Sequence, residues 1–322
     1  MLPQQSGKLM TTAGGFETWM QYVDGFKLRH FCAFELLNDA RGLGCLRDYH
    51  RKVVEAATAN GFGVINEGLH YRSSRDWGEL IGFSREALLE INVRGIEFYR
   101  DFAREYAGPD TPMLVGGVVG PRGDAYNIGR LPDAAEAEDY HSEQIRIFRE
   151  AGADHVTAMT FSSVDEAIGV ARAAKSVGIP VVISLLLARG GRLKGGETLE
   201  EAITRVDSAT DDAPAYYMIN CTHPTEFEPA LTTGKWISRL GGFMPNAVAM
   251  ETLDLCKLGH LEDGDPVELG AQMGALAQRF PHINVWGGCC GTDGRHIGEI
   301  TRQVREMRRV GAVDFAATAQ SH

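Results

Sequence analysis

The stretch INVWGGCC (residues 283–290) is the last apolar run before the C-terminus, and it ends in two glycines and two adjacent cysteines. An earlier run, YYMINC (residues 216–221), ends in a third cysteine. Nearly continuous apolar runs are typical of parallel strands that are covered on both faces. Candidate site residues at the ends of strands so far apart in the chain favour a closed barrel, because all its strand ends meet at one mouth.

Apolar runs recur along the whole chain and alternate with longer amphipathic stretches. The candidate strands are roughly 9–14, 63–68, 113–120, 155–161, 181–187, 216–221, 243–249 and 283–288. Helical patterns lie at 84–105, 133–151, 163–177, 197–206, 266–279 and 295–310. This alternation predicts parallel strands joined by helical crossovers. We expect an α/β fold, a single-domain (β/α)8 TIM barrel over residues 9–312 with tails at 1–8 and 313–322; an open doubly wound sheet is the alternative.

The composition limits the class of protein. The 322 residues are 44% hydrophobic and 23% charged, with a net charge of −11, which is an ordinary globular profile. No stretch interleaves basic with aromatic residues and none is apolar over 18 residues, which argues against nucleic acid and membrane partners. Six cysteines are too few for a secreted disulfide scaffold, and the N-terminus lacks the apolar stretch of a signal peptide. We expect a cytoplasmic enzyme that acts on small molecules. The sequence does not indicate its oligomeric state.

The three cysteines at strand ends, Cys221, Cys289 and Cys290, are candidate metal ligands. Three thiolates would leave a fourth position open, as in catalytic rather than structural zinc sites. Successive side chains of a strand point to opposite faces, so Cys289 and Cys290 can share an ion only where the backbone bends. The flanking glycines 287, 288 and 291 supply that freedom. The alternative is that these cysteines only fill core space.

Longer motifs surround these cysteines. They are GGCCGTD (287–293), NCTHP (220–224), VGPRGDAY (119–126), TFSSVDEA (160–167) and GGFET (14–18). Together they resemble the homocysteine S-methyltransferase family, zinc-dependent barrels that methylate homocysteine to methionine. The resemblance covers about residues 10–305 and implies Zn²⁺ bound by Cys221, Cys289 and Cys290. It also implies a small-molecule thiol acceptor and a sulfonium methyl donor, S-methylmethionine or S-adenosylmethionine.

The resemblance also suggests contacts for the amino-acid part of the acceptor. Glu166 would bind the ammonium group and Gly14 would offer a backbone amide. Glu166 has an alternative role, because Ser163 and Glu166 have the spacing of a capping box at a helix start, as do Asp133 and Glu136. Asn220 would support the neighbouring cysteine or contact substrate; the alternative is a turn residue.

The chain departs from the family at strand ends. Ala13 stands where the family has an aspartate that helps to bind the amino group, and Gly68 and His70 lie in a divergent stretch after the second strand. The loop 188–192 is basic where the family is often acidic. We expect the metal chemistry to be retained and the acceptor pocket to be altered.

Three readings of the site follow. Glu17, Glu67 or His70 replaces the missing charge, and the acceptor is homocysteine. Alternatively, the acceptor is another thiol or a selenol, or the methyl donor differs. The third reading is a non-catalytic zinc protein whose site is closed by His223 or a partner.

Overall fold

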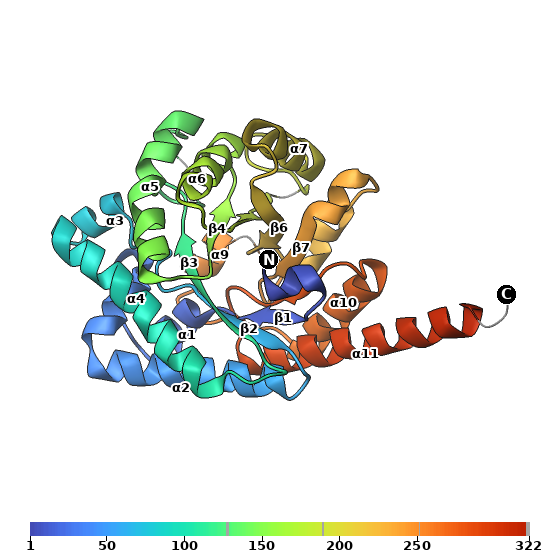
Figure 1. The fold of residues 1–322 in the computed structure, drawn as a ribbon. Helices are drawn as coiled ribbons and strands as arrows, with labels where there is room; N and C mark the ends of the chain where they lie inside the picture. The colour runs from blue at the N-terminus through green and yellow to red at the C-terminus, as the bar shows by residue number, and fades with distance from the viewer. Residues whose placement is uncertain (127–128, 189, 251, 320–322) are drawn as a thin grey trace.

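The computed structural model describes residues 1–322 except 127–128, 189, 251 and 320–322, and it leaves out the side chains of 252, 253, 256 and 311–319. Within this part of the chain, parallel strands close into one barrel in chain order. Helices surround the barrel (Figure 1). The strands are β1 Met10–Thr12, β2 Gly63–Asn66, β3 Met113–Val119, β4 His155–Phe161, β5 Val181–Leu185, β6 Pro214–Asn220, β7 Leu240–Met244 and β8 Val285–Trp286. The predicted (β/α)8 barrel is confirmed.

The first and last strands close the barrel. Met10 of β1 pairs with Gly63 of β2 on one side and with Val285 of β8 on the other. The Thr11 hydroxyl adds to this closure by donating to the carbonyl oxygen of Trp286 at 2.7 Å. The closure brings the segments after β1 and β8 together at the mouth, although more than 270 residues separate them.

The helices follow the amphipathic stretches. They are α1 Phe16–Tyr22, α2 Ala40–Thr58, α3 Arg75–Leu80, α4 Arg85–Tyr106, α5 Ala134–Ala151, α6 Val164–Val177, α7 Leu199–Thr210, α8 Pro224–Phe227, α9 Thr252–Lys257, α10 Pro266–Arg279 and α11 Gly294–Ala319. Short 3-10 segments lie at Pro3–Ser6, Arg29–Phe31, Ala33–Asn38, Glu228–Ala230 and Lys235–Arg239. Helix α11 continues through residue 312, where the sequence analysis placed a domain boundary, and its end extends beyond the barrel (Figure 1).

The seventh strand differs from its predicted position. The sequence analysis placed it at 243–249, but β7 is Leu240–Met244. In the sequence, Gly241 and Gly242 look like a turn before a strand. In the structure, an added Cβ would meet the Tyr216 ring at Gly241 and the Val285 side chain at Gly242. Both glycines therefore allow close packing inside the strand.

Apolar side chains pack together inside the barrel. They are Leu2, Met10, Ile65, Leu114, Val182, Tyr216, Met218, Met244 and Val285. Residues 1–8 were expected as a tail, but Pro3–Ser6 form a 3-10 turn, and buried Gln4 donates to the Tyr216 hydroxyl at 2.9 Å. The N-terminal segment therefore covers the barrel floor, and open space remains at the carboxyl ends of the strands.

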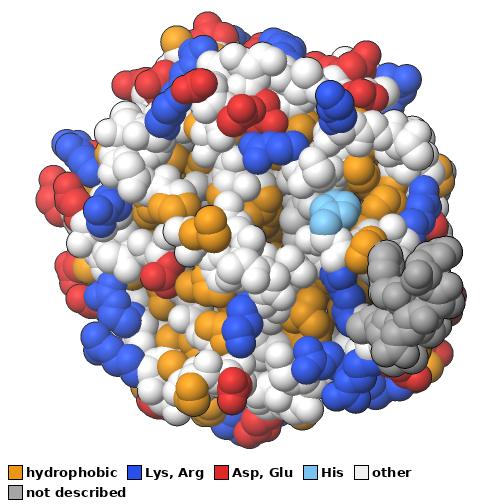
Figure 2. All heavy atoms as spheres, turned by 45° about the vertical axis from the view of Figure 1, so that its right-hand side comes forward, with side chains coloured by type: hydrophobic (Ala, Val, Ile, Leu, Met, Phe, Trp, Pro, Cys, Tyr) orange, Lys and Arg blue, Asp and Glu red, His pale blue; other side chains and the backbone are white. Residues whose placement is uncertain are grey.

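The molecular surface carries both signs of charge. On the face shown in Figure 2, basic and acidic side chains surround small apolar areas. Among the described residues, no helix combines the length and the apolar character needed to cross a bilayer.

The capping box at the start of α5 provides a test of local stability. The Asp133 carboxylate accepts from the amides of Ala135 and Glu136, each at 2.9 Å, and the Glu136 carboxylate accepts from the Asp133 amide. We expect Asp133→Ala to lower the free energy of unfolding by about 1 kcal/mol in urea denaturation. Asp139→Ala is the control, because its carboxylate is exposed and forms a surface ion pair with Arg75; it should change stability by less than about 0.5 kcal/mol. Equal losses in both variants would contradict the capping role.

Candidate metal centre

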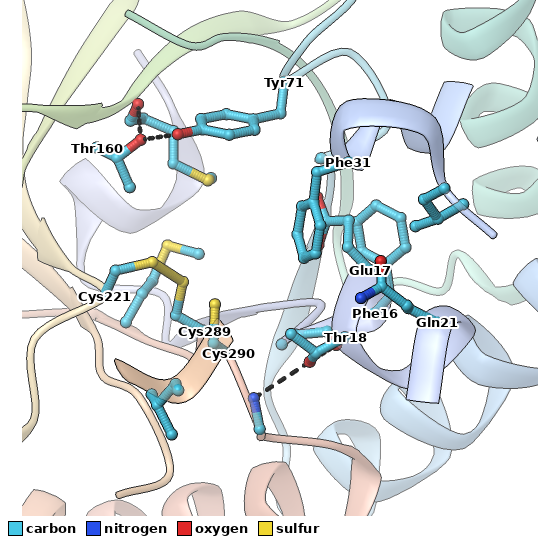
Figure 3. Close-up of a pocket in the computed structure, with 18 of the residues that line it drawn as sticks. Phe16, Glu17, Thr18, Gln21, Phe31, Tyr71, Thr160, Cys221, Cys289 and Cys290 are labelled. Carbon is cyan, nitrogen blue, oxygen red and sulfur yellow. Dashed lines mark hydrogen bonds between the residues drawn. A yellow bond between two sulfur atoms is a disulfide. The ribbon is translucent and has the colours of Figure 1, made fainter. Parts of the chain in front are cut away.

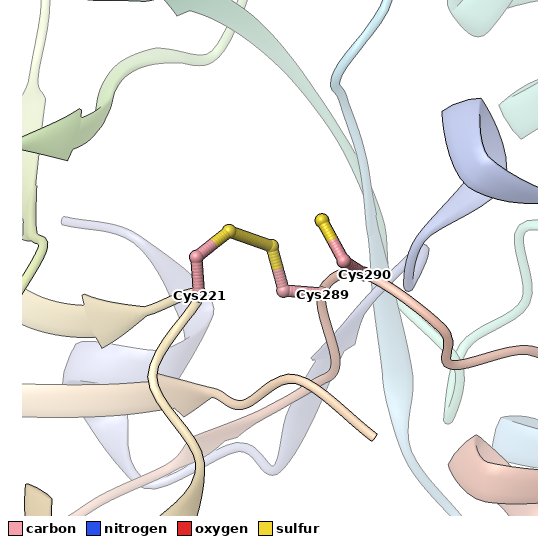
Figure 4. Close-up of side chains that lie close together, drawn as sticks. All are labelled: Cys221, Cys289 and Cys290. Atoms are coloured by element: carbon pink, nitrogen blue, oxygen red, sulfur yellow. A yellow bond between two sulfur atoms is a disulfide. The ribbon is translucent and has the colours of Figure 1, made fainter. Parts of the chain in front are cut away.

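The three predicted ligands meet at the mouth of the barrel. Cys221 directly follows β6, and Cys289 and Cys290 follow β8. Their sulfur atoms all lie within 4.8 Å of one another (Figure 4). Among the described residues, these three cysteines are the one group of three or more His, Cys, Asp or Glu side chains that lie close enough together to hold a metal ion. His223 is not part of this group.

Two of the three sulfurs are joined in the structure. Cys221 and Cys289 form a disulfide, and Cys290 lies beside it (Figure 4). The sequence analysis expected three thiols available to a metal, so the structure corresponds to an oxidised arrangement of the same cluster. Metal binding through all three residues requires reduction of this disulfide, because the ligand form of cysteine is the thiolate.

The cysteine cluster suits a tetrahedral ion. Zinc lies about 2.3 Å from each sulfur ligand, which puts tetrahedral sulfur pairs about 3.8 Å apart. The observed spread of at most 4.8 Å is close to that spacing. Reduction would therefore require only a small adjustment of side chains that already share one space.

The backbone around the cysteines is held by hydrogen bonds to the neighbouring strand. The Cys221 amide donates to the Met244 carbonyl oxygen at 3.0 Å, and the Cys289 amide donates to that of Pro245 at 2.7 Å. Cys221 has a φ of 53°, a left-handed value that is uncommon outside glycine. The chain therefore turns sharply at the end of β6, which is where a ligand is needed.

Of the three glycines that flank the cysteines, Gly287 and Gly288 act differently from the prediction. Only Gly291 has a positive φ, 81°. An added Cβ at Gly287 would collide with the Thr12 side chain, and one at Gly288 with that of Thr292. These two glycines are therefore required for close packing against β1 and the following turn, rather than for unusual dihedrals.

A cavity of about 370 Å³ opens next to the cysteines (Figure 3). The cysteines form one wall, and residues of α1 and of the following segment form the wall opposite (Figure 3). The aromatic lining residues are Phe16, Tyr22, Phe31, Tyr71 and Tyr126. Such a cavity, apolar with a few polar groups, is typical of a small-molecule site.

Three of the five predicted substrate residues line this cavity. They are Gly14, Glu17 and Glu67. Glu166 lines a neighbouring cavity instead, where its carboxylate accepts from His141 Nε2 at 3.0 Å and from the Arg122 amide at 2.6 Å. The capping box predicted for α6 is only half formed: Ser163 Oγ accepts from the Glu166 amide, but the Glu166 carboxylate turns to His141.

Asn220 has a supporting position. Its Oδ1 accepts from the Thr160 amide at 3.1 Å and from Ser184 Oγ at 2.7 Å, so it ties the ends of β4, β5 and β6 together. Thr160 has a φ of 63° and its hydroxyl lies 2.5 Å from the Tyr71 hydroxyl. The sequence analysis did not identify this Tyr71–Thr160 pair, although both residues line the cavity.

The structure favours neither of the two histidine alternatives. His70 is fully buried, its Nε2 lies 3.1 Å from the Asn92 carbonyl oxygen, and burial lowers its pKa to about 4. It does not line the cavity, so it cannot replace a charge there. His223 caps α8, with Nδ1 accepting from the Thr225 amide.

The two carboxylates of the cavity differ in their surroundings. Glu67 is 3% exposed; its Oε2 accepts from Thr157 Oγ1 at 2.7 Å and lies 3.3 Å from His155 Nε2. Burial raises the pKa of Glu17 to about 7, although its own backbone amide and the nearby Arg72 cation lower it.

This shift predicts a pH-dependent cost to folding. The pKa of Glu17 in the folded protein exceeds its usual value of 4.5. Its ionisation therefore lowers the free energy of unfolding as pH rises from about 4.5 to 7, and the whole loss is present above that range. In ligand-free protein, Glu17→Gln should raise the free energy of unfolding at pH 8 by about 1–3 kcal/mol and change it little at pH 4. Denaturation at both pH values measures this, with Glu79→Gln on exposed α3 as the control. The same gain at both values would show that Glu17 does not titrate as described.

Comparison with known proteins identifies the family. The sequence pattern of the homocysteine S-methyltransferase family matches residues 13–304. The chain belongs to that family. Methionine synthase of Mycobacterium tuberculosis is 25% identical over 96% of this chain, and betaine–homocysteine S-methyltransferase 1 of Rattus norvegicus is 24% identical over 65% of it. The chain spans 26% and 53% of the lengths of these two relatives.

Solved structures show the same fold. The homocysteine methyltransferase MmuM from Escherichia coli matches in its oxidised form with a TM-score of 0.72 at 17% identity, covering 91% of this chain and 94% of that one. Its metallated form matches with a TM-score of 0.68 at 16% identity, covering 91% and 95%. Members of this family are methyltransferases, which agrees with a mouth that joins a thiol cluster to a small-molecule cavity.

Proposed function

We propose that the protein is a zinc-dependent S-methyltransferase that transfers a methyl group from a sulfonium donor, S-methylmethionine or S-adenosylmethionine, to homocysteine and forms methionine. The observation that carries this proposal is the meeting of three cysteine sulfurs within 4.8 Å on the wall of a cavity of about 370 Å³. The cavity is large enough for small molecules and reaches the sulfurs directly.

The donor set fits zinc better than harder ions, because thiolates select zinc over magnesium or calcium. Zinc held by Cys221, Cys289 and Cys290 would keep an acceptor thiol in its nucleophilic thiolate form at neutral pH. A free thiol has a pKa near 8.5 and is mostly protonated there.

The residues of the chain provide the surroundings for the displacement. The acceptor sulfur forms a bond to the methyl carbon as the bond from that carbon to the donor sulfonium breaks, and the donor leaves as a neutral thioether. Apolar walls from Phe31, Tyr71 and Met159 limit the water around the reacting atoms. Because the donor loses its charge in the transfer, an acidic cavity attracts the substrate more than the product.

A second candidate is the same transfer with a different thiol or selenol acceptor, or with a different methyl donor. Ala13 favours it, because this buried residue lines the cavity and offers no polar side chain to an amino group. Glu166, the other residue expected to bind that group, lies in the neighbouring cavity.

A product assay separates these candidates. Reduced protein loaded with zinc is incubated with homocysteine and each sulfonium donor, and then with a panel of other thiols and selenols. Methionine as the main product supports homocysteine as the acceptor, whereas preferred methylation of another acceptor supports the second candidate. Zinc-loaded protein that methylates no acceptor with any donor would contradict both and would favour a non-catalytic zinc protein.

A further inference from the structure

The acidic groups of the cavity are not equally available to a ligand. Asp124 pairs with Arg72 at 2.8 Å, and Glu262 pairs with His260 at 2.7 Å. Glu67 accepts from Thr157 at 2.7 Å. Among the described residues, the Glu17 carboxylate has no ion-pair partner and no hydrogen bond from another side chain. Glu17 is therefore an acidic residue of the cavity wall whose charge has no direct partner.

The cation near Glu17, Arg72, has other direct partners. Arg72 Nη1 donates to the His30 carbonyl oxygen at 2.8 Å, Nη2 donates to Asp124, and the guanidinium lies 4.1 Å from the centre of the Trp77 ring. Arg72 therefore bonds to Asp124 and to the loop around His30, and it acts on Glu17 at a distance without pairing with it. The unpaired charge of Glu17 favours a cationic ligand.

Aromatic side chains share the cavity wall with this charge. Glu17, Phe16 and Phe31 lie on the wall opposite the cysteines (Figure 3). His30 and Phe31 have φ values of 49° and 64°, left-handed values that are uncommon outside glycine and costly for a bulky residue such as Phe31. The Arg72 contact to His30 holds this strained loop at the cavity, and strain of this kind is characteristic of ligand sites.

Other polar side chains of α1 that line the cavity are Thr18, Gln21 and Tyr22, and Thr18 has internal partners. The Thr18 hydroxyl donates to the Gly15 carbonyl oxygen at 2.7 Å and accepts from the Gly291 amide at 3.2 Å. A primary ammonium has three N–H donors and needs several acceptors. A fully methylated cation has no such donors and is stabilised by aromatic faces and a nearby negative charge. The aromatic ring of Phe31 and the unpaired carboxylate of Glu17 therefore suit a methylated cation, which needs no further acceptors.

We propose that Glu17 determines the specificity for the methyl donor: its carboxylate faces the positive centre of a methylated sulfonium or quaternary ammonium ion that packs against Phe31, opposite the cysteines. This assignment rests on the proposed methyl transfer and names the residue that selects a charged donor. Because the donor still carries much of its positive charge in the transition state, Glu17 stabilises the bound donor and the transition state to a similar extent. Its loss should raise the donor KM and leave kcat nearly unchanged.

Binding without turnover tests the assignment. Choline and trimethylsulfonium are the cationic probes, 3,3-dimethyl-1-butanol is the neutral isostere of choline, and ethanolamine is the ammonium analogue. In calorimetric titration at pH 8, the full-length protein should bind choline at least 10-fold more tightly than the isostere and than ethanolamine. Glu17→Gln should reduce the preference for choline over the isostere to less than about 2-fold, while affinity for the isostere stays unchanged, which shows that the cavity is intact.

Controls separate this proposal from the proposed function. Glu79→Gln, on exposed α3, should retain the full preference for cations. An unchanged preference in Glu17→Gln, or equal binding of ethanolamine and choline, would overturn the assignment even where the protein forms methionine. In steady-state assays, a rise in the acceptor KM rather than the donor KM would overturn it as well. An intact preference for cations in a protein that methylates no thiol would instead reject only the proposed methyl transfer.

Discussion

Cys290→Ala is expected to abolish methyl transfer, with a decrease in kcat/KM of at least about 1000-fold, and to reduce bound zinc to well below one ion per chain. The variant removes one of three sulfurs that lie within 4.8 Å of one another. With two thiolates left, the site loses much of its affinity, and the acceptor thiol loses the means to stay deprotonated at neutral pH. Metal analysis and steady-state kinetics on reduced protein measure both effects.

Cys290 is the most informative of the three cysteines because it is not part of the disulfide between Cys221 and Cys289. A loss of activity in its variant therefore cannot be explained by the loss of that cross-link. Cys45→Ser is the control, since Cys45 lies in α2 and does not line the cavity. Full activity and full zinc content in Cys290→Ala would exclude the three-thiolate centre.

Gly15→Ala should have the second largest effect on stability and zinc binding, because Gly15 packs against the backbone that carries Cys289 and Cys290. An added Cβ would fall against the Cys289 carbonyl oxygen and lie 3.0 Å from the Cys290 Cα, and neither backbone atom can rotate away. We expect a loss of about 3 kcal/mol in the free energy of unfolding, at the upper end of typical overpacking costs. Zinc affinity should fall at least 10-fold, because the displaced segment carries two of the three ligands.

Thermal denaturation and competitive zinc titration test this expectation. Gly44→Ala is the matched control, since Gly44 lies on the exposed face of α2 and an added Cβ there meets nothing within 4 Å. It should stabilise the protein by about 0.5–1 kcal/mol, because alanine is the better helix former. A Gly15→Ala variant with normal stability and normal zinc affinity would show that the segment carrying Cys289 and Cys290 is not held rigidly.

The sequence predicted the barrel because the apolar runs of parallel strands are distinct from the amphipathic helices between them. Strand β4 was predicted at its observed bounds, 155–161, and α10 at 266–279. Strand β7 was misplaced because its glycines pack against residues 216 and 285, a tertiary contact that local sequence does not show. The sequence did predict the ends of β6 and β8, because in each case the cysteines directly follow the apolar run of the strand.

The substrate wall was harder to predict than the metal ligands. Glu166 has the spacing of a capping box, yet His141, 25 residues earlier on α5, takes its carboxylate. Glu17 and Glu67 look alike in sequence, and only their partners distinguish them: Glu67 accepts from Thr157 on another strand, and Glu17 is left without an ion pair in the described residues. Such differences depend on which distant side chains the fold brings near, so no spacing rule detects them.

The central claim is that three sulfurs from two distant strand ends bind one zinc ion and leave one position for substrate. X-ray absorption at the zinc edge of the reduced protein tests it most directly. The account predicts about one zinc per chain with three sulfur neighbours near 2.3 Å and one lighter atom, changing to four sulfurs when the thiol acceptor is added. A protein nitrogen that stays bound after the thiol is added, or reduced protein that binds no zinc, would contradict it.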